Sequence, residues 1–415
     1  MSTVVTRQVL AQPRVQPATR ATYVAFIGCG FAFASWASRI PQVRDRLHLT
    51  SQELGLVLLT LASGSVVALV LAGMIVHKFS SRRTVAVMSV GVGVALAAVA
   101  SGYLVGVVPV VVGLFLYGFA TATWDVAMNV QGAAVERRSG RAIMPRFHAG
   151  YSIGTVAGAL VGAAMVALHI PITAHLIAVG VIVAVATPIA VRRFISDVDP
   201  ESVLDVPAAH GSTSGGSASA LRRWLEPRTL LVGLVVLAFA FAEGAGNDWI
   251  NLSLIDGYGL PAVVGTLGFA VFLAAMTAGR WFADGILARY GRVVVVRAQG
   301  VLAIIGLLLF VYGHAVPLAF VGLLLWGVGA SLGFPVGMSA AADDPAAAAG
   351  RVSVVASIGY CAFLGGPPLI GYLGEHVTVL HALMAVAVVL ALATLITGAM
   401  RPLPAAAPSQ PETVS

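Results

Sequence analysis

The chain alternates between long runs of apolar residues and short polar stretches. Twelve of the runs approach twenty residues, the length that an α-helix needs to cross a bilayer core of about 30 Å. The pattern therefore predicts an all-α integral membrane protein with twelve transmembrane helices. The runs lie at residues 21–38, 54–76, 84–102, 105–130, 147–168, 172–191, 229–251, 262–284, 293–312, 316–341, 351–374 and 377–399.

One polar stretch near the middle of the chain is longer than the others and differs in composition. Residues 196–225 begin with four acids and continue with a Gly- and Ser-rich segment, 211–219, which is typical of a flexible linker. This linker separates two groups of six predicted helices. The expected divisions are a tail at 1–20, a six-helix bundle at 21–191, a linker at 192–228, a second six-helix bundle at 229–399 and a tail at 400–415.

The two groups of helices carry weakly repeated sequences. Lys78-Phe79-Ser80 recurs as Arg289-Tyr290-Gly291, and Gly150-Tyr151 recurs as Gly359-Tyr360. The two spacings are nearly equal, and each match falls in the corresponding helix of the other group, which indicates an internal duplication. Parallel six-helix repeats joined by a linker are typical of alternating-access carriers.

Basic residues favour one set of the loops between the predicted helices. They precede the first run and follow the second and fourth, as at Arg20, Lys78 and Arg146, whereas the opposite loops hold three arginines, all within residues 39–46. Loops rich in Lys and Arg stay in the cytoplasm, so both termini are expected there. Residues 1–20 contain no apolar stretch, so no cleavable signal peptide is expected.

The composition excludes several classes of function. Of 415 residues, 59% are hydrophobic and 10% are charged, whereas a soluble domain has about 25% charged residues. The net charge of +7 comes from bases at loop edges, which suits orientation in a membrane better than binding of nucleic acid. Two cysteines in apolar runs supply neither a disulfide framework nor a metal cluster. Because no phosphate-binding loop and no set of catalytic side chains is evident, neither an enzyme nor a cofactor is expected.

A short basic turn follows the second apolar run. It reads Gly73-Met-Ile-Val-His77-Lys78-Phe79-Ser80-Ser81-Arg82-Arg83 and resembles the signature turn of the major facilitator superfamily, with His77 and Ser80 in place of that family's Asp and Gly. A second copy at 284–292 keeps the Gly and the bases but has Ala at the position of the acid. The resemblance extends over the whole chain and implies that family's fold. Residues of both turns are expected to gate the cytoplasmic side: His77, Lys78, Arg82, Arg83, Asp284, Arg289 and Arg292.

Several other stretches resemble a little-characterised bacterial branch of the superfamily, distantly related to fucose/proton symporters. They are Ser38-Arg39-Ile40-Pro41, Met144-Pro-Arg146-Phe-His148-Ala-Gly150, Glu243-Gly244 with Asp248-Trp249, and Gly365-Gly-Pro367-Pro368. The branch implies the plasma membrane of a bacterium. Fucose symporters carry acids in spans one and four, but span one of this chain has none, so a fucose substrate is not expected.

The seventh apolar run contains an unusual polar stretch, Phe239-Ala-Phe-Ala-Glu243-Gly-Ala-Gly-Asn247-Asp248-Trp249. An ionisable group at mid-depth costs about 2.5 kcal/mol or more, so its retention indicates a function. Glu243 lies deep in the run with no base within one turn, and we expect it to carry a coupling proton. Asn247 shares its helix face. Asp248 and Trp249 suit either a substrate cavity or the wet end of the helix.

Other candidates are expected on the helices that line the cavity in this superfamily, namely spans one, four, seven and ten. Asp125 and Asn129 share a face of span four, and Trp124 beside them is suited to stacking on a ligand. Asp125 is placed within roughly 10 Å of the cytoplasmic end and Glu243 roughly 20 Å above it, so each is expected to serve a different mouth. A purely structural pair between Asp125 and a loop base such as Arg146 is equally open.

The remaining candidates carry alternative roles. Trp36 in span one is a candidate for lining the cavity, whereas Tyr360 faces either the cavity or a neighbouring helix. His148 and Tyr151 open span five, where they either relay protons or contact the loop that contains Arg146. Arg280 lies four residues before Asp284, and an ion pair within the helix or at its end is expected there, with a substrate role as the alternative.

These features predict a proton-coupled secondary transporter that moves a small organic solute, such as a metabolite, a sugar-like compound or a drug. Its expected partners are that solute, protons and the lipid bilayer, and it is expected to be a monomer that binds no nucleic acid. The alternatives are a sensor or scaffold that has kept the fold without transport, and a membrane-embedded enzyme.

Overall fold

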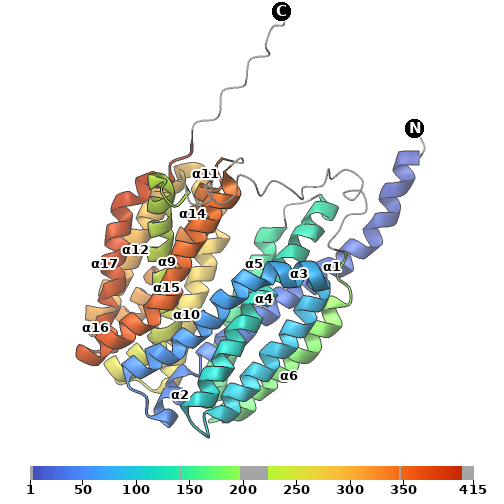
Figure 1. Ribbon diagram of the computed structural model, residues 1–415. Coiled ribbons are helices and arrows are strands. Elements are labelled where there is room, and N and C mark those ends of the chain that lie inside the picture. The colour runs from blue at the N-terminus through green and yellow to red at the C-terminus, as the bar shows by residue number, and fades with distance from the viewer. Residues whose placement is uncertain (1–2, 141–142, 197–222, 345–346, 404–415) are drawn as a thin grey trace, which may run out of the picture.

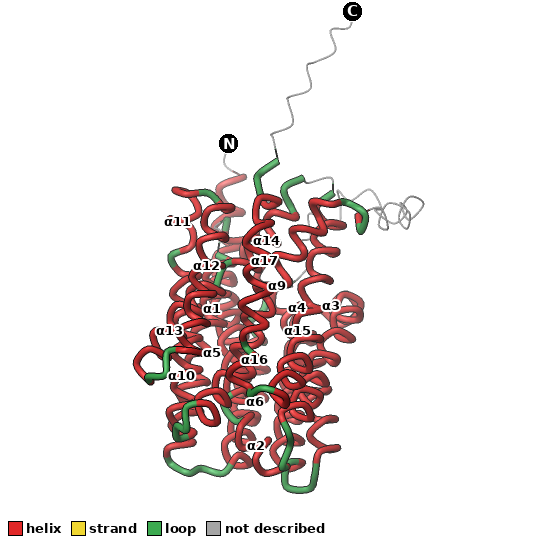
Figure 2. The backbone as a smooth tube through the Cα atoms, turned by 90° about the vertical axis from the view of Figure 1, so that its left-hand side faces the viewer, coloured by secondary structure: helices red, strands yellow, loops and turns green. Residues whose placement is uncertain are grey.

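The computed structural model describes residues 3–140, 143–196, 223–344 and 347–403, so most of the expected linker at 192–228 lies outside the described residues. Within these ranges the backbone is helical, with short loops and no strand (Figure 2). The described part contains 11 helices that are long and apolar enough to cross a membrane. The elements are α1 (Thr3–Ala37), α2 (Ile40–Leu47), α3 (Ser51–Gly102), α4 (Val107–Ser139), α5 (Met144–Ala167), α6 (Ile172–Val191), α9 (Pro227–Leu252), the π-helix η1 (Ser253–Gly257), α10 (Ala262–Trp281), α11 (Ala283–Tyr290), α12 (Arg292–Tyr312), α13 (Val316–Ala330), α14 (Gly333–Ala341), α15 (Ala348–His376), α16 (Val379–Ala382), α17 (Met384–Ile396) and the 3-10 helix η2 (Thr397–Met400).

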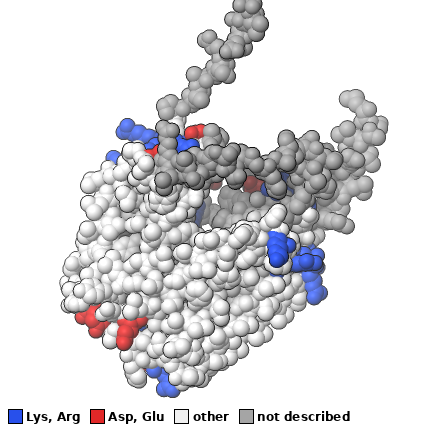
Figure 3. All heavy atoms as spheres, in the orientation of Figure 1, with Lys and Arg blue, Asp and Glu red and all other residues white. Residues whose placement is uncertain are grey.

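The two ends of the molecule differ in what they carry. In Figure 1 the described part of the chain begins and ends at one end of the molecule, here called the terminal end, and α2 lies at the opposite, distal end. The helices of residues 3–196, the first half, lie to the right, and those of residues 223–403, the second half, lie to the left. Charged side chains gather near the two ends and leave the flank between them almost uncharged (Figure 3). Side chains such as Val70 and Leu395 on the outer face are more than 70% exposed, as expected of a surface that contacts lipid.

Helix α3 is too long for one crossing. Its 52 residues span about 78 Å at 1.5 Å per residue, against a hydrocarbon core of about 30 Å. Ser80 interrupts the helix with φ 69° and ψ 156°, a conformation outside the helical region. Gly291, its counterpart in the repeated sequence, separates α11 from α12 with φ 72° and ψ 156°. The backbone therefore turns in the same way at the two copies of the basic turn.

Glycines allow neighbouring helices to approach closely. A Cβ atom at Gly64 of α3 would collide with the backbone of Phe115 in α4, and one at Gly118 of α4 would collide with Leu61 in α3. Such close backbone contact stabilises helix pairs in lipid, where no hydrophobic effect drives them together. The abundance of Gly in the sequence is thus used at helix crossings.

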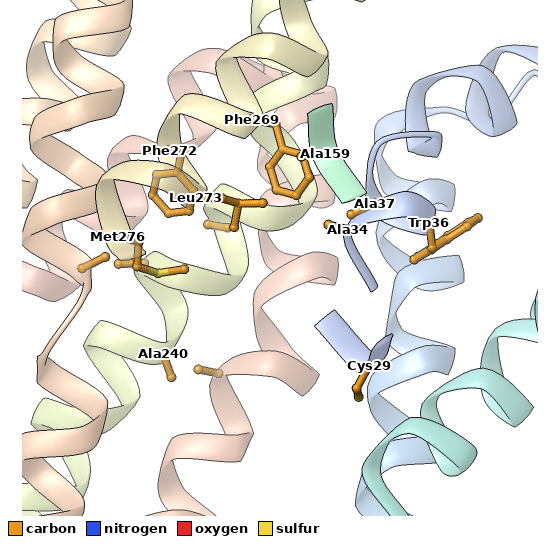
Figure 4. Close-up of a cluster of buried hydrophobic side chains, with 14 of the residues drawn as sticks. Cys29, Ala34, Trp36, Ala37, Ala159, Ala240, Phe269, Phe272, Leu273 and Met276 are labelled. Carbon is orange, nitrogen blue, oxygen red and sulfur yellow. The ribbon is translucent and has the colours of Figure 1, made fainter. Parts of the chain in front are cut away.

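The two halves meet near the distal end. The start of α3 packs on α15, where a Cβ atom at Gly55 would lie 2.5 Å from the carbonyl oxygen of Pro367. Arg44 of α2 forms an ion pair with Asp256 of η1. Helix α10 packs on α5, and Figure 4 shows Phe269 of α10 on the side that faces Ala159.

The break at Ser80 generates a first prediction. A positive φ with ψ near 156° is a conformation that only Gly adopts without strain, at a cost of about 1–3 kcal/mol for other residues. Ser80→Gly should therefore raise the thermal unfolding midpoint of the purified protein, and Gly291→Ser should lower it. The two exchanges are matched controls for one another, since each changes the same atoms in the opposite direction. An unchanged midpoint in both would show that the turn relaxes without strain.

Candidate functional site

A half-buried ion pair forms within the second half. Arg280 of α10 donates from Nη2 to Glu243 Oε2 of α9 at 2.9 Å, with side chains 30% and 20% exposed. Its Nε also donates to the carbonyl oxygen of Ser331 at 3.2 Å, in the link between α13 and α14. The expected pair between Arg280 and Asp284 is wrong, because α10 ends at Trp281 and Asp284 belongs to the separate helix α11. The base that was missing from the helix of Glu243 comes from the next helix.

Asp125 lies on α4 in the first half and is half-buried. Asn129 donates from Nδ2 to the backbone oxygen of Asp125 at 2.9 Å and to its Oδ1 at 3.3 Å. Arg146, the loop base weighed as its structural partner, is exposed and forms no ion pair with Asp125 among the described residues. Asp125 therefore has an amide as its partner.

The structure places Asp125 and Glu243 at similar depths. Helix α4 continues to Ser139, so Asp125 lies about 21 Å from that end of the helix, while Glu243 lies about 24 Å from the start of α9 at Pro227. The expectation of two carboxylates at different depths is wrong because it ended span four at residue 130. The helix continues since its face still packs, with Gly132 against Met144 and Phe147.

Tyr151 links the two carboxylates in space. It lies on α5 within electrostatic range of Asp125, Glu243 and Cys29. Tyr360 of α15, its counterpart in the repeat, also lies within electrostatic range of Asp125. The two tyrosines come from different halves, and we refer to Asp125, Tyr151, Tyr360 and the Glu243–Arg280 pair, which are related by these electrostatic interactions, as the polar cluster.

Helix α9 presents further polar groups that lack a full set of partners among the described residues. Asn247 Oδ1 is buried without a hydrogen bond, and Asp248, which is half-buried, makes neither a hydrogen bond nor an ion pair among the described residues. One turn beyond, Asn251 donates to the carbonyl oxygen of Ala37 at 3.4 Å and leaves Oδ1 unpartnered. Buried polar groups are normally paired, so this row of groups indicates a surface that water or a solute occupies.

The three tryptophans expected to face the cavity are buried in helix packing. Trp36, Trp124 and Trp249 are at most 2% exposed. Trp124 packs against α1, where a Cβ atom on Gly28 would lie 3.7 Å from its ring. Figure 4 shows Trp36 on the side of α1 that points away from α10. In this conformation none of the three rings is open to a ligand, so the expected stacking of Trp124 on a ligand is not seen here.

The bases expected to gate one face lie at the terminal end. His77, Lys78, Arg82 and Arg83 are exposed around the break at Ser80, and Arg289 is exposed before Gly291, as are Asp284 of α11 and His148 of α5. The ring of His148 packs edge-on at 5.3 Å from that of Phe26. Exposure at this end fits contact with water or lipid headgroups for all of these side chains.

Arg292 is held in a network that the sequence did not reveal. It donates from Nη1 to Asp343 Oδ1 at 2.7 Å, and Arg228 donates to Asp343 Oδ2, also at 2.7 Å. These hydrogen bonds hold the pKa of Asp343 below its usual range. The network joins α9, α12 and the end of α14. The sequence alone shows only acids and bases in separate loops, with no signal for their pairing.

Glu226 forms a second network beside the first. Burial alone would raise the pKa of Glu226, but hydrogen bonds from Arg351, Arg223 and Thr229 outweigh it and bring that pKa to about 2. Glu226 therefore stays ionised and ties the start of α9 to α15 through Arg351 Nε at 2.7 Å. Among the described residues no group of His, Cys, Asp and Glu side chains is arranged to hold a metal ion.

Comparisons with known proteins agree with this architecture. The model of the Major Facilitator Superfamily matches residues 21–365. The chain is 30% identical over 361 residues to "Uncharacterized transporter y4wD" of Sinorhizobium fredii (strain NBRC 101917 / NGR234), which covers 86% of this chain and 92% of that protein. The fold of this chain is similar to that in a crystal structure of a variant of the nucleoside transporter NupG. The TM-score is 0.76 at 15% identity, and the match covers 93% of this chain and 99% of that one.

The fold also resembles the E. coli fucose:proton symporter FucP, with a TM-score of 0.61 at 13% identity, over 94% of this chain and all of that one. At such identities a structural likeness shows the fold alone. The family model covers most of the sequence, and the relative covers most of it independently. The chain therefore belongs to the Major Facilitator Superfamily of membrane transporters.

Proposed function

We propose that this protein is a secondary active transporter that moves a small polar organic solute by alternating access, coupled to protons. The observation that carries the proposal is the polar cluster at mid-depth, where the Glu243–Arg280 pair, Asp125 and two tyrosines come together in an otherwise apolar protein. Charged groups at this depth are costly, and their usual role is to bind the solute or the coupling ion. The contacts between the halves near the distal end support a gate there.

The topology we propose has twelve crossings. Helix α3 supplies two of them, divided at Ser80, and the other ten candidate helices supply one each. They form two bundles of six, at 21–191 and 229–399, with a linker at 192–228 and tails at 1–20 and 400–415. The terminal end, with its basic turns, faces the cytoplasm, so the conformation described is closed toward the outside of a bacterial inner membrane. The protein acts as a monomer.

Glu243 is the proposed site that binds the coupling proton, and its ion pair with Arg280 links protonation to solute binding. A proton on Glu243 would remove the negative charge that holds the guanidinium, which frees Arg280 to bind an acceptor group of the solute. Asn247 and Asp248 extend the binding surface along α9, with Asn129 and Asp125 on α4 and Tyr360 on α15. Asp125 and Asp248 have no basic partner among the described residues and are the second candidates for carrying protons.

The solute is a small molecule with hydrogen-bonding groups, since the cluster offers a guanidinium, carboxyl groups, amides and phenols. Structures of similar fold include a nucleoside transporter and a fucose:proton symporter. A thermal-shift screen of the purified protein with nucleosides, hexoses, deoxyhexoses and small organic anions therefore identifies a solute that binds. That solute is then used in the flux measurements.

A flux experiment tests the coupling role. Glu243→Gln removes the exchangeable proton and should lower proton-driven accumulation of the screened solute in proteoliposomes by about tenfold or more, while counterflow persists. Glu375→Gln makes the same change at an exposed carboxylate near the end of α15, outside the cluster and the gating turns, and as the matched control it should transport like wild type. Full accumulation in the Gln variant would contradict the role of Glu243 and make Asp125 and Asp248 the residues to test.

A stability cycle tests the ion pair without knowledge of the solute. Arg280→Gln leaves Glu243 as an unpaired, half-buried carboxylate and should destabilise the protein by about 1–3 kcal/mol, less than the loss for a fully buried pair. The double variant Glu243→Gln/Arg280→Gln should recover most of that loss. Thermal unfolding in detergent measures all the variants. Additive losses in the double variant would show that the two side chains do not interact.

Fusion reporters test the topology. A reporter that is active only outside the cytoplasm should be silent when it follows Ser415 or is inserted at Gly215, and active when it is inserted after His48 in the distal loop between α2 and α3. The outside insertion checks that the fusions are exported and functional. Activity at Ser415 or Gly215 would refute the proposed orientation.

A further inference from the structure

A second polar site lies at the distal end, away from the mid-depth cluster. A pocket of about 480 Å³ opens between the first half and the start of α10 in the second half. No Asp or Glu lines it in the described part of the chain. Its walls are formed by Arg39, Gln42, Tyr103, Val166, His169, Ile170, Pro171, Ile172, Pro261, Ala262 and Val263.

Arg39 is a buried cation without a carboxylate. It is 3% exposed, and it donates from Nε to His175 Nδ1 at 3.0 Å and from Nη2 to the carbonyl oxygen of Ile170 at 3.1 Å. Its Nη1 makes no hydrogen bond to any described residue. His175 accepts on Nδ1, so its ring is neutral there and does not balance the charge. A buried charge that lacks a counter-ion is costly unless an external anion supplies one.

Two helix N-termini open onto the same pocket. Helix α6 begins at Ile172 after Pro171, and α10 begins at Ala262 after Pro261, and each helix is 20 residues long. The two prolines have nearly identical backbone angles, φ −56° and −57° with ψ 147° in both. The first backbone N–H groups of a helix have no internal partner and carry a partial positive charge, which attracts anions. The pocket thus combines a guanidinium with the positive ends of two helices.

We infer that this pocket binds an oxyanion of the phosphate type. Arg39 Nη1 and the free N–H groups at the starts of α6 and α10 donate to it, and Arg39 receives the counter-charge that the described residues do not provide. A free phosphate and the phosphate of a lipid headgroup offer the same chemistry. Because α6 belongs to the first half and α10 to the second, the anion bridges the halves and stabilises the closed distal end. The site does not depend on the proposed transport activity.

Thermal unfolding of the purified full-length protein tests the site. Inorganic phosphate is titrated in detergent against chloride at equal ionic strength, and phosphatidylglycerol is compared with phosphatidylcholine in mixed micelles. Phosphate, phosphatidylglycerol or both should raise the unfolding midpoint, and the arm that responds identifies the source of the anion. Arg39→Gln should weaken the apparent affinity about tenfold or more, as expected for the loss of charge-assisted hydrogen bonds. Arg46→Gln removes an exposed arginine of the same helix region and should respond like wild type.

A second variant covers the case in which Arg39→Gln does not fold. Ala262→Glu places a carboxylate at the first turn of α10, where it occupies the site and interacts favourably with the helix end. This variant should unfold at a higher temperature than wild type without phosphate and should lose most of its response to added anion. The inference is overturned if neither anion raises the midpoint of the wild type, or if Arg39→Gln and Ala262→Glu respond as the wild type does.

Discussion

The absence of water around the hydrocarbon-facing flank is the constraint on which the rest of the structure depends. Every backbone group in that layer has to be satisfied within the chain, which favours helices throughout the described residues. Lipid also removes the hydrophobic drive for helices to associate, so close packing replaces it, as where Gly64 and Gly118 bring α3 and α4 together. The long apolar runs and the many glycines of the sequence are thus both consequences of the lipid environment.

This constraint explains why most of the fold was predictable from the sequence. Hydropathy reports where a helix enters lipid, and the predicted runs coincide with the candidate membrane helices of the structure, apart from the division of α3. Hydropathy does not report where a helix ends once it leaves lipid. Helix α4 continues to Ser139 because Glu136 accepts hydrogen bonds from the backbone N–H groups of Ile143 and Met144 and so ties α4 to the start of α5. The depth of Asp125 was misjudged for that reason.

The partners of charged side chains were less predictable than the helices. The spacing of four residues along a helix predicted an ion pair between Arg280 and Asp284. A break at Phe282 separates these two residues, and the guanidinium of Arg280 pairs with Glu243 of α9 instead. Asp343 likewise pairs with Arg292 of α12, and Glu226 pairs with Arg351 of α15 as well as with the nearby Arg223. Such choices depend on how helices cross, which a single sequence does not encode locally. The burial of Trp36, Trp124 and Trp249 was not predicted for a related reason. An aromatic ring in a membrane helix packs against a neighbouring helix as readily as it faces a cavity.

Uncompensated polar groups carry more information in this protein than paired ones. In a soluble protein, water satisfies an unpaired amide or guanidinium at little cost, whereas at membrane depth such a group costs several kcal/mol. Asn247 and Asp248 on α9 and Arg39 near the distal end remain without full partners, although nearby helices supply many polar backbone and side-chain groups. The same energetic argument therefore identifies both sites. The polar row on α9 is the surface proposed to bind the solute, and Arg39, beside two helix N-termini and with no carboxylate partner among the described residues, is the group proposed to bind an anion.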